Sequence, residues 1–232
     1  MFKVLRTNTL VPLVLSFCLG AQAHMAVLSA DQDVSAALER MNQASAQFKA
    51  MSADVRLQEY TKLLDDKTTQ TGTVKMQRAK GGEIRAIVEF QDQQTLAFSG
   101  KNLTIYYPKL GEYQVYPASK LGSTLNQYLL LGFGSSGRDL AANYNISGEG
   151  TEKMGDKTTV KLLLTPKDPK VASRLAKVEL WIPTDAGYPV QQQFWEPSGN
   201  YRLVTYSKIQ INPPITGNLE FKPPAGAKRQ SK

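Results

Sequence analysis

Hydrophobic residues follow a helical spacing near the start of the chain. Between residues 31 and 51 the apolar positions recur at intervals of three, four and seven residues: Val34, Leu38, Met41 and Phe48. This spacing predicts an amphipathic helix that lies on an apolar surface. Asp31 or Asp33 is the expected N-cap of this helix.

After this helix the hydrophobic period changes to two. Ile84, Ala86, Val88 and Phe90 share one side of their segment, as expected of a half-buried strand. Similar alternation predicts strands at 53–63, 71–78, 83–90, 94–99, 101–107, 112–116, 144–148, 159–165, 175–182, 190–195, 201–211 and 219–221. The connections between the predicted strands up to residue 116 are too short for parallel crossovers, so these strands are expected to pair antiparallel.

Two further helices are expected between the two groups of strands. Residues 119–131 carry helical spacing, and a short helix at 136–142 can begin after Ser136, with Asp139 completing a capping box. Several strands also carry bulk on the side expected to be polar: Tyr106, Leu163, Trp181, Val204 and Tyr206. An antiparallel sheet with one solvated face does not need such bulk. The pattern therefore predicts a curved antiparallel sheet that is covered on one face and encloses something on the other.

Residues 1–23 have the features of a secretory signal. Lys3 and Arg6 precede a largely apolar stretch, residues 10–19, which is too short for a permanent membrane-spanning helix. Ala21-Gln22-Ala23 matches a signal-peptidase site. We therefore expect cleavage after Ala23.

Cleavage at this site would define the mature protein. It would leave residues 24–232 as a single domain and remove Cys18, so that no cysteine remains. A later cut after Ala30 is the alternative. An exported, cysteine-free chain of this kind is expected in a bacterial periplasm.

Candidate catalytic residues are few, because the chain contains one histidine and one cysteine. A nucleophile–histidine site would have to use His24, and a metal site rich in these residues is not expected. Residues 132–137 match G-x-G-x-x-G, but the flanking pattern is antiparallel, so we interpret them as a hinge-like loop. A glycosidase-like pair of carboxylates stays open, with a solvated strand face as the alternative; the candidates are Glu89, Asp92, Glu179 and Glu196.

The formal net charge of +8 does not identify a partner. Basic residues are dispersed, and no aromatic-plus-basic signature of RNA recognition is present, so we expect no nucleic-acid partner. No cofactor and no enzymatic activity are predicted. The most informative feature is the apolar run Leu129-Leu130-Leu131-Gly132-Phe133, which has to be buried or to cover a ligand.

The order of segments resembles the LolA family of periplasmic carriers for outer-membrane lipoproteins and its LolA-like superfamily. The resemblance covers roughly residues 31–227. It rests on these segments: Ala46-Gln47-Phe48-Lys49-Ala50-Met51, Gln58, Thr71-Gly72-Thr73-Val74-Lys75-Met76, Ile84-Arg85, the stretch from Phe98-Ser99-Gly100-Lys101 to Tyr106-Tyr107-Pro108, Leu130-Leu131-Gly132, Asn143-Tyr144-Asn145-Ile146, and Phe221-Lys222-Pro223-Pro224-Ala225-Gly226.

This resemblance implies an α+β, mainly antiparallel fold. The expected architecture is an open, incomplete β-barrel of ten or eleven strands with helices covering an apolar cavity. The resemblance implies cavity residues Val88, Phe90, Leu103, Ile105, Val178 and Leu180, and lid residues Leu125, Leu129 and Phe133. It also implies a latch arginine bonded to helix carbonyls, for which Arg78 and Arg85 are the candidates.

The function implied is that of a periplasmic chaperone for lipoproteins. It would shield their acyl chains between the inner and the outer membrane, as a monomer that binds lipidated proteins or other acyl-chain ligands. Its partners would be an inner-membrane lipoprotein-releasing complex and an outer-membrane acceptor. The alternatives are a LolA-like regulatory module that senses lipids or proteins in the cell envelope, and a periplasmic hydrolase.

Overall fold

The computed structural model describes residues 21–91, 93–99, 101–117, 131–215, 217 and 219–230. Within these residues the chain forms one sheet of twelve strands in the order β12-β6-β5-β4-β3-β2-β1-β11-β10-β9-β8-β7. The strands are β1 (Ala50–Thr61), β2 (Asp66–Arg78), β3 (Ile84–Phe90), β4 (Gln94–Phe98), β5 (Asn102–Tyr107), β6 (Glu112–Pro117), β7 (Tyr144–Met154), β8 (Lys157–Pro166), β9 (Lys177–Pro183), β10 (Gln191–Trp195), β11 (Tyr201–Ile211) and β12 (Lys228–Arg229).

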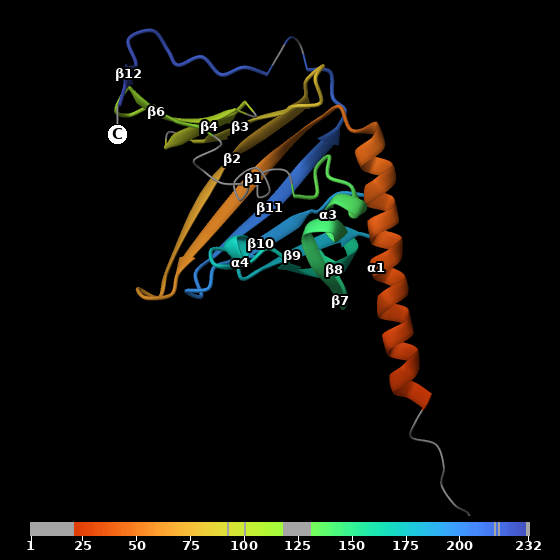
Figure 1. Ribbon diagram of the computed structural model, residues 1–232. Helices are drawn as coiled ribbons and strands as arrows, with labels where there is room; N and C mark the ends of the chain where they lie inside the picture. The colour runs from red at the N-terminus through yellow and green to blue at the C-terminus, as the bar shows by residue number, and fades with distance from the viewer. Residues whose placement is uncertain are drawn as a thin grey trace, which may run out of the picture.

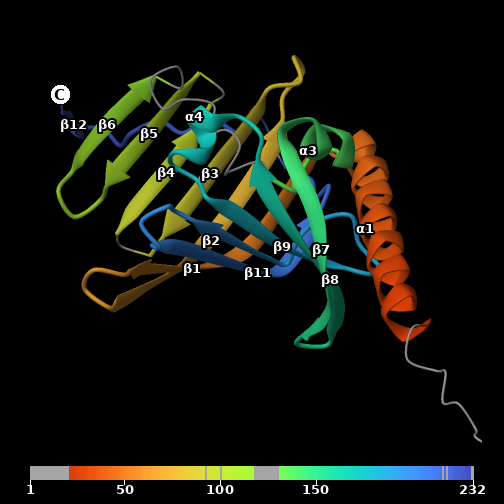
Figure 2. The same ribbon diagram turned by 60° about the horizontal axis from the view of Figure 1, so that its bottom comes forward.

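The sheet is antiparallel throughout, except where β12 pairs with β6 in parallel. It curves strongly and stays open, with β7 at one edge and β12 at the other (Figures 1 and 2). Most connections are short turns between sequence neighbours, whereas β1 and β11 meet from distant parts of the chain. The open, mainly antiparallel fold expected from the sequence is therefore confirmed.

Helix α1 (Ala21–Gln47) runs along one flank of the sheet and contacts β7, β8 and α3 (Figure 1). Ala37 and Met41 are fully buried on its apolar face, with Val34 and Leu38 packed beside them. Its predicted bounds were wrong at both ends. The helix begins before Asp31 and Asp33, so neither residue is its N-cap, because the alanine-rich segment before them also favours a helix. The helix ends before Phe48, and β1 begins at Ala50.

The short helices follow their capping signals. Helix α3 (Gly137–Asn143) confirms the predicted helix, since Ser136 and Asp139 form the expected capping box. Helix α4 (Pro169–Ala172) was not predicted, although Asp168 caps it and proline occupies its first position. The helix predicted at 119–131 lies outside the described residues except for Leu131, which is part of a turn.

The strand predicted at 219–221 was wrong. The backbone N–H of Leu219 donates to the side chain of Gln77 and not to a neighbouring strand, and Phe221 packs against Tyr106. This C-terminal segment crosses from the end of β11 to β6, where β12 joins the sheet (Figure 1). Its contact with Tyr106 explains why that strand carries an aromatic residue on the face that the sequence pattern marks as polar.

Most buried apolar residues form two clusters on the inner face of the sheet, the face to which Val55, Val74 and Leu180 point. The first cluster lies below α1 and α3 and includes Met41, Leu140 and the apolar positions of β8 and β9. The second includes Phe48, Phe133 and the apolar positions of β1, β2 and β3. Val204 packs against both clusters, so β11 joins them.

Candidate functional site

An apolar groove of about 410 Å³ opens on the inner face of the sheet. Five strands, β1, β2, β3, β10 and β11, supply most of its wall, and β4 completes it. Its apolar lining consists of Val55, Leu57, Val74, Met76, Val88, Phe90, Leu96, Leu175, Phe194 and Val204. A wall of this composition has the character of a small-molecule pocket, in which a few polar groups orient an apolar ligand.

The strand alternation explains why these residues meet. Val74, Val88 and Leu96 are directly paired across β2, β3 and β4, so they form one apolar row on the inner face. Leu57 and Val204 form a second apolar pair across β1 and β11. Residues at alternate positions point to the other face, where Asp54 and Arg56 carry charge.

The structure places Val88 and Phe90 in the wall of the groove, but not the other four residues of the implied cavity. Leu103 and Ile105 continue the inner face on β5, beside Phe98 and Leu96, beyond the groove lining. Val178 and Leu180 on β9 are fully buried in the first cluster. This cluster also contains Met41 of α1 and Leu140 of α3, so Val178 and Leu180 differ from Val88 in the cluster to which they belong and not in their strand pattern.

The segment 131–134 packs at one end of the groove. Phe133 is 1% exposed, and its ring forms a T-shaped pair with that of Tyr206, a groove residue, at a centroid distance of 4.9 Å. Gly134 has a φ of +74°, and a Cβ there would lie 2.8 Å from Cδ1 of Phe48. Glycine is therefore required for both backbone and packing reasons. Leu125 and Leu129, the other implied lid residues, lie outside the described residues.

A buried polar chain ties this segment to the sheet. The hydroxyl of Tyr206 donates to Oε1 of Gln192 at 2.8 Å, and Nε2 of Gln192 donates to the carbonyl oxygen of Leu131. Burial raises the pKa of Tyr206, so the hydroxyl stays protonated and remains a donor. Gln192 is 1% exposed, and both of its polar atoms are satisfied. The sequence pattern marked Tyr206 as bulk on the side expected to be polar, but the structure places it on the inner face, and nothing in the pattern indicated Gln192 as its partner.

The two latch candidates have different surroundings. Nε of Arg78 donates to the carbonyl of Phe48 at 3.2 Å, and Nη2 donates to the carbonyl of Gly134 at 3.0 Å. Its guanidinium also lies 5.8 Å from the ring centroid of Phe48. Arg85 instead lies on the outer face beside Glu83, with 3.7 Å between the charged atoms. Only Arg78 of the two therefore links the residue after α1, Phe48, to segment 131–134, and neither of the carbonyls that it binds lies in a helix.

The open end of the groove is charged. Nε of Arg202 lies 2.9 Å from Oε1 of Glu59, and its Nη1 lies 3.0 Å from Oε1 of Glu196. Each of them lies two residues from an apolar inner-face position. Glu59 is next to Leu57 of β1 on that face, Arg202 to Val204 of β11, and Glu196 to Phe194 of β10. We call Glu59, Arg202 and Glu196 the mouth cluster.

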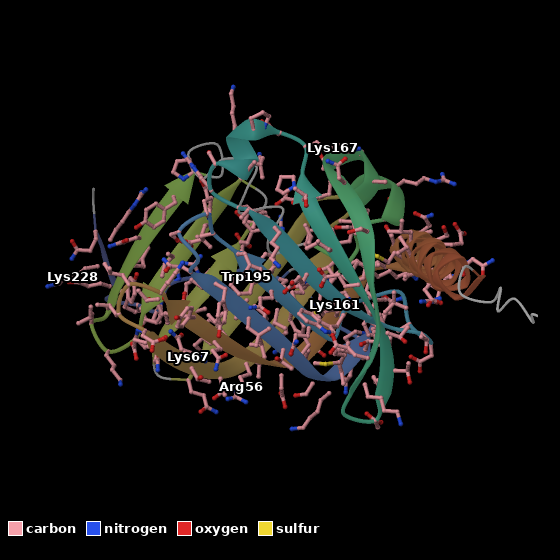
Figure 3. The ribbon with its side chains drawn as sticks, turned by 90° about the horizontal axis from the view of Figure 1, so that it is seen from below. Arg56, Lys67, Lys161, Lys167, Trp195 and Lys228 are labelled. Atoms are coloured by element: carbon pink, nitrogen blue, oxygen red, sulfur yellow. The ribbon has the colours of Figure 1, made fainter. Side chains whose placement is uncertain are left out.

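The outer face carries a second polar cluster. Glu179 is 5% exposed, accepts a hydrogen bond from Nε1 of Trp195 at 3.0 Å and pairs with Lys177 and Lys161. Burial raises the pKa of Glu179, but these hydrogen bonds and the lysine charges outweigh it, so the pKa lies below its usual value. The lysines also lie over tryptophan rings, Lys161 over Trp181 and Lys177 over Trp195. Figure 3 labels Lys161 on β8 and Trp195 on β10. This explains the bulk of Trp181 on the outer side of β9.

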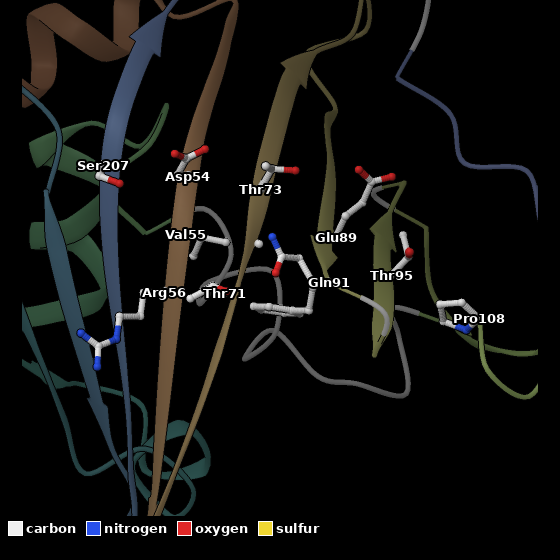
Figure 4. Close-up of a pocket in the computed structure, with 12 residues that line it drawn as sticks. Asp54, Val55, Arg56, Thr71, Thr73, Glu89, Gln91, Thr95, Pro108 and Ser207 are labelled. Atoms are coloured by element: carbon white, nitrogen blue, oxygen red, sulfur yellow. The ribbon is translucent and has the colours of Figure 1, made fainter.

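A larger hollow of about 560 Å³ is lined by more polar and charged residues than apolar ones (Figure 4). Asp54, Thr73 and Glu89 are paired across β1, β2 and β3, with Ser207 on the other side of Asp54. The carboxylate of Asp54 is paired with Lys208 at 2.8 Å. A row of charged and hydroxyl groups does not suit an apolar ligand, so the groove is the candidate site.

The carboxylates considered for hydrolysis lie in separate surroundings. Glu179 is paired with lysines on the outer face, Glu196 with Arg202 at the groove mouth, and Glu89 lies in the polar hollow; Asp92 is outside the described residues. Among the described residues, no three His, Cys, Asp or Glu side chains are grouped to hold a metal ion. Over the same part of the chain, no helix combines the length and the apolar character that crossing a bilayer requires.

Comparisons with known structures agree with this architecture. MucB matches over 82% of this chain and 63% of its own, with 16% identity and a TM-score of 0.51. An uncharacterized conserved protein from Thermus thermophilus matches over 87% of this chain and 98% of its own, with 14% identity and a TM-score of 0.51. A LolA superfamily protein from Nitrosomonas europaea, NE2245, aligns over 79% of this chain and 95% of its own, with 16% identity and a TM-score of 0.37.

The chain therefore shares the fold of MucB and of the Thermus thermophilus protein. It spans less than two thirds of the length of MucB. Residues 83–215, more than half of the chain, match the model of a family whose description reads "Uncharacterized protein", and the chain belongs to that family. No curated protein matches the chain.

Proposed function

We propose that this protein is a periplasmic carrier that shields acyl chains of lipidated proteins in the inner-face groove. The observation that supports this proposal is the groove itself, whose wall is apolar on six strands and whose charged residues lie at one end. Transport between an inner-membrane releasing complex and an outer-membrane acceptor would follow from this activity. The LolA-like fold is consistent with the role but does not by itself define it.

The energetics of acyl chains make such shielding effective. Each buried methylene contributes about 0.8 kcal/mol, so a chain of about sixteen carbons gains about 12 kcal/mol from complete burial. A chain with this preference leaves a membrane for water only rarely. A groove that covers most of the acyl chain compensates the free energy lost when the acyl chain leaves the membrane, and so lets the lipid cross an aqueous compartment.

Two neighbouring residues of β1 provide a test. Leu57 lines the groove, whereas Gln58 points to the outer face of the same strand. Leu57→Asp places a charge in the apolar wall, and we expect it to weaken binding of a dansyl-labelled alkyl chain with a neutral head at least tenfold. Gln58→Asp is the matched control and is expected to bind the probe normally. Equal binding by all three proteins would refute the groove as the acyl-chain site.

The native cargo can be examined by mass spectrometry after gentle purification from the periplasm. Lipidated proteins or free lipids, retained by the wild type and lost in Leu57→Asp, are the expected result. Retention of one regulatory protein in equal amount by both variants would instead favour a sensing module. Retention of neither lipid nor lipidated protein by the wild type would contradict the carrier proposal.

A further inference from the structure

The volume of the groove limits how many acyl chains it can hold. A cavity of about 150 Å³ accommodates benzene, so each carbon needs about 25 Å³. At that value the 410 Å³ of the groove corresponds to about sixteen carbons. This is the size of one ordinary acyl chain, so only one chain of a lipid with two or three chains can lie fully inside the groove.

The mouth cluster sets the electrostatic preference at the polar end of such a ligand. Among the described residues, its two carboxylates and one guanidinium are the charged groups of the groove lining, and they sum to a single negative charge. Arg202 is already bonded to both acids, so an anionic head group would have to displace one of them. Lys62, on the neighbouring turn, extends over Gly199 and is not part of the lining.

The two acids retain acceptor capacity for a cation. Arg202 binds one oxygen of each carboxylate, and the second oxygen of Glu196 accepts only long hydrogen bonds, 3.3 Å from Ser198 and 3.3 Å from Asn200. Glu59 and Glu196 are each about one third exposed, so a head group can reach them from solvent. An ammonium group gains from this surplus of negative charge, and a carboxylate or sulfate does not.

We propose that the groove selects a single-chain amphiphile whose head carries an ammonium group, with the chain on the apolar wall and the ammonium group at Glu59 and Glu196. This inference rests on the proposed acyl-chain binding and specifies its ligand. Lysophosphatidylethanolamine has the required chemistry. Lysophosphatidylglycerol is the matched comparison, because it has the same chain and phosphate but lacks the ammonium group.

Calorimetric titration below the micelle concentration tests the head-group preference. With sixteen-carbon chains, we expect lysophosphatidylethanolamine to bind about tenfold more tightly than lysophosphatidylglycerol. The double variant Glu59→Gln/Glu196→Gln should remove this preference. Asp54→Asn, which changes a carboxylate on the outer face, should keep it. Equal affinities of the wild type for the two lysolipids would overturn the proposal.

Chain length and chain number provide the second measurement. From ten to about sixteen carbons, each added methylene should strengthen binding by up to fourfold, which corresponds to about 0.8 kcal/mol, and the gain should then stop. Phosphatidylethanolamine, with two chains, should bind no more tightly than its one-chain relative. A steady gain beyond eighteen carbons, or a two-chain lipid that binds over tenfold more tightly, would overturn the single-chain inference.

The outcomes separate this inference from the proposed function. If the neutral dansyl probe binds and Leu57→Asp abolishes its binding, the groove is an acyl-chain site even when no head-group preference is found. In that case only the present inference fails. If the probe and both lysolipids do not bind to the wild type, the proposed function fails as well.

Discussion

Arg78 is expected to contribute to stability through the contacts that join α1 to segment 131–134. Arg78→Met keeps most of the aliphatic stem but removes both hydrogen bonds, to Phe48 and to Gly134. A hydrogen bond to a charged group contributes about 1.5–3 kcal/mol. The Gly134 carbonyl keeps a second donor, the hydroxyl of Ser45 at 2.9 Å. Only the bond to Phe48 is therefore lost without replacement, and we expect a destabilisation of about 2 kcal/mol.

Urea unfolding provides the assay, with Arg85→Met as the matched control. A loss of about 2 kcal/mol lowers the urea midpoint by about 1 M at an m-value near 2 kcal/mol/M. Arg85 loses only a partly exposed ion pair with Glu83, so its variant should change stability by less than about 1 kcal/mol. Hydrogen exchange should locate the Arg78 effect in the amides of residues 131–134. Equal midpoints for the two variants would refute the assignment of Arg78 as the link.

Two further predictions concern the buried acid and the glycine beside Phe48. Glu179→Gln should cost about 2 kcal/mol at pH 7. Because the folded-state pKa of Glu179 is lowered, its contribution to stability is present above the unfolded pKa near 4.3 and is lost as the pH falls through the folded-state pKa, so the urea midpoints of wild type and variant should converge as the pH falls below that pKa. Gly134→Ala should lower the thermal midpoint more than Gly155→Ala, since both glycines have positive φ, at +74° and +65°, but only Gly134 has a close neighbour; equal midpoints would contradict the packing argument.

The alternation of hydrophobic residues predicted most of the sheet because eleven described strands have at least one half-buried or buried face. The prediction at 219–221 failed for a specific reason. Leu219 and Phe221 alternate as strand residues do, but a side chain, Gln77, takes the place of a neighbouring strand as hydrogen-bond partner. Capping signals were reliable where they were complete, as at Ser136. At α4 the capping signals were overlooked, because a helix of a single turn is too short to show a hydrophobic period.

The position of the groove could be predicted less well than the sheet. Val88 and Leu180 have the same alternating pattern, yet one lines the groove and the other is buried in the cluster that includes Met41 of α1. Which part of the inner face a helix covers is a tertiary property, and strand periodicity does not carry it. The mouth cluster could have been suspected from Leu57-x-Glu59 and Phe194-x-Glu196, where an inward apolar position is followed two residues later by an acid.

The relation between the Arg78 link and ligand access follows from the same geometry. The groove has its volume of about 410 Å³ while Arg78 is bonded to both carbonyls, so one chain has room without release of segment 131–134. A ligand that enters without opening this link pays no free energy to open it, so the link does not lower the affinity of the ligand. We therefore expect Arg78→Met to change the affinity for a single-chain lysolipid by less than about threefold, despite its cost in stability. If entry required release of the link, removing about 2 kcal/mol would instead strengthen binding about thirtyfold, and calorimetry distinguishes the two results.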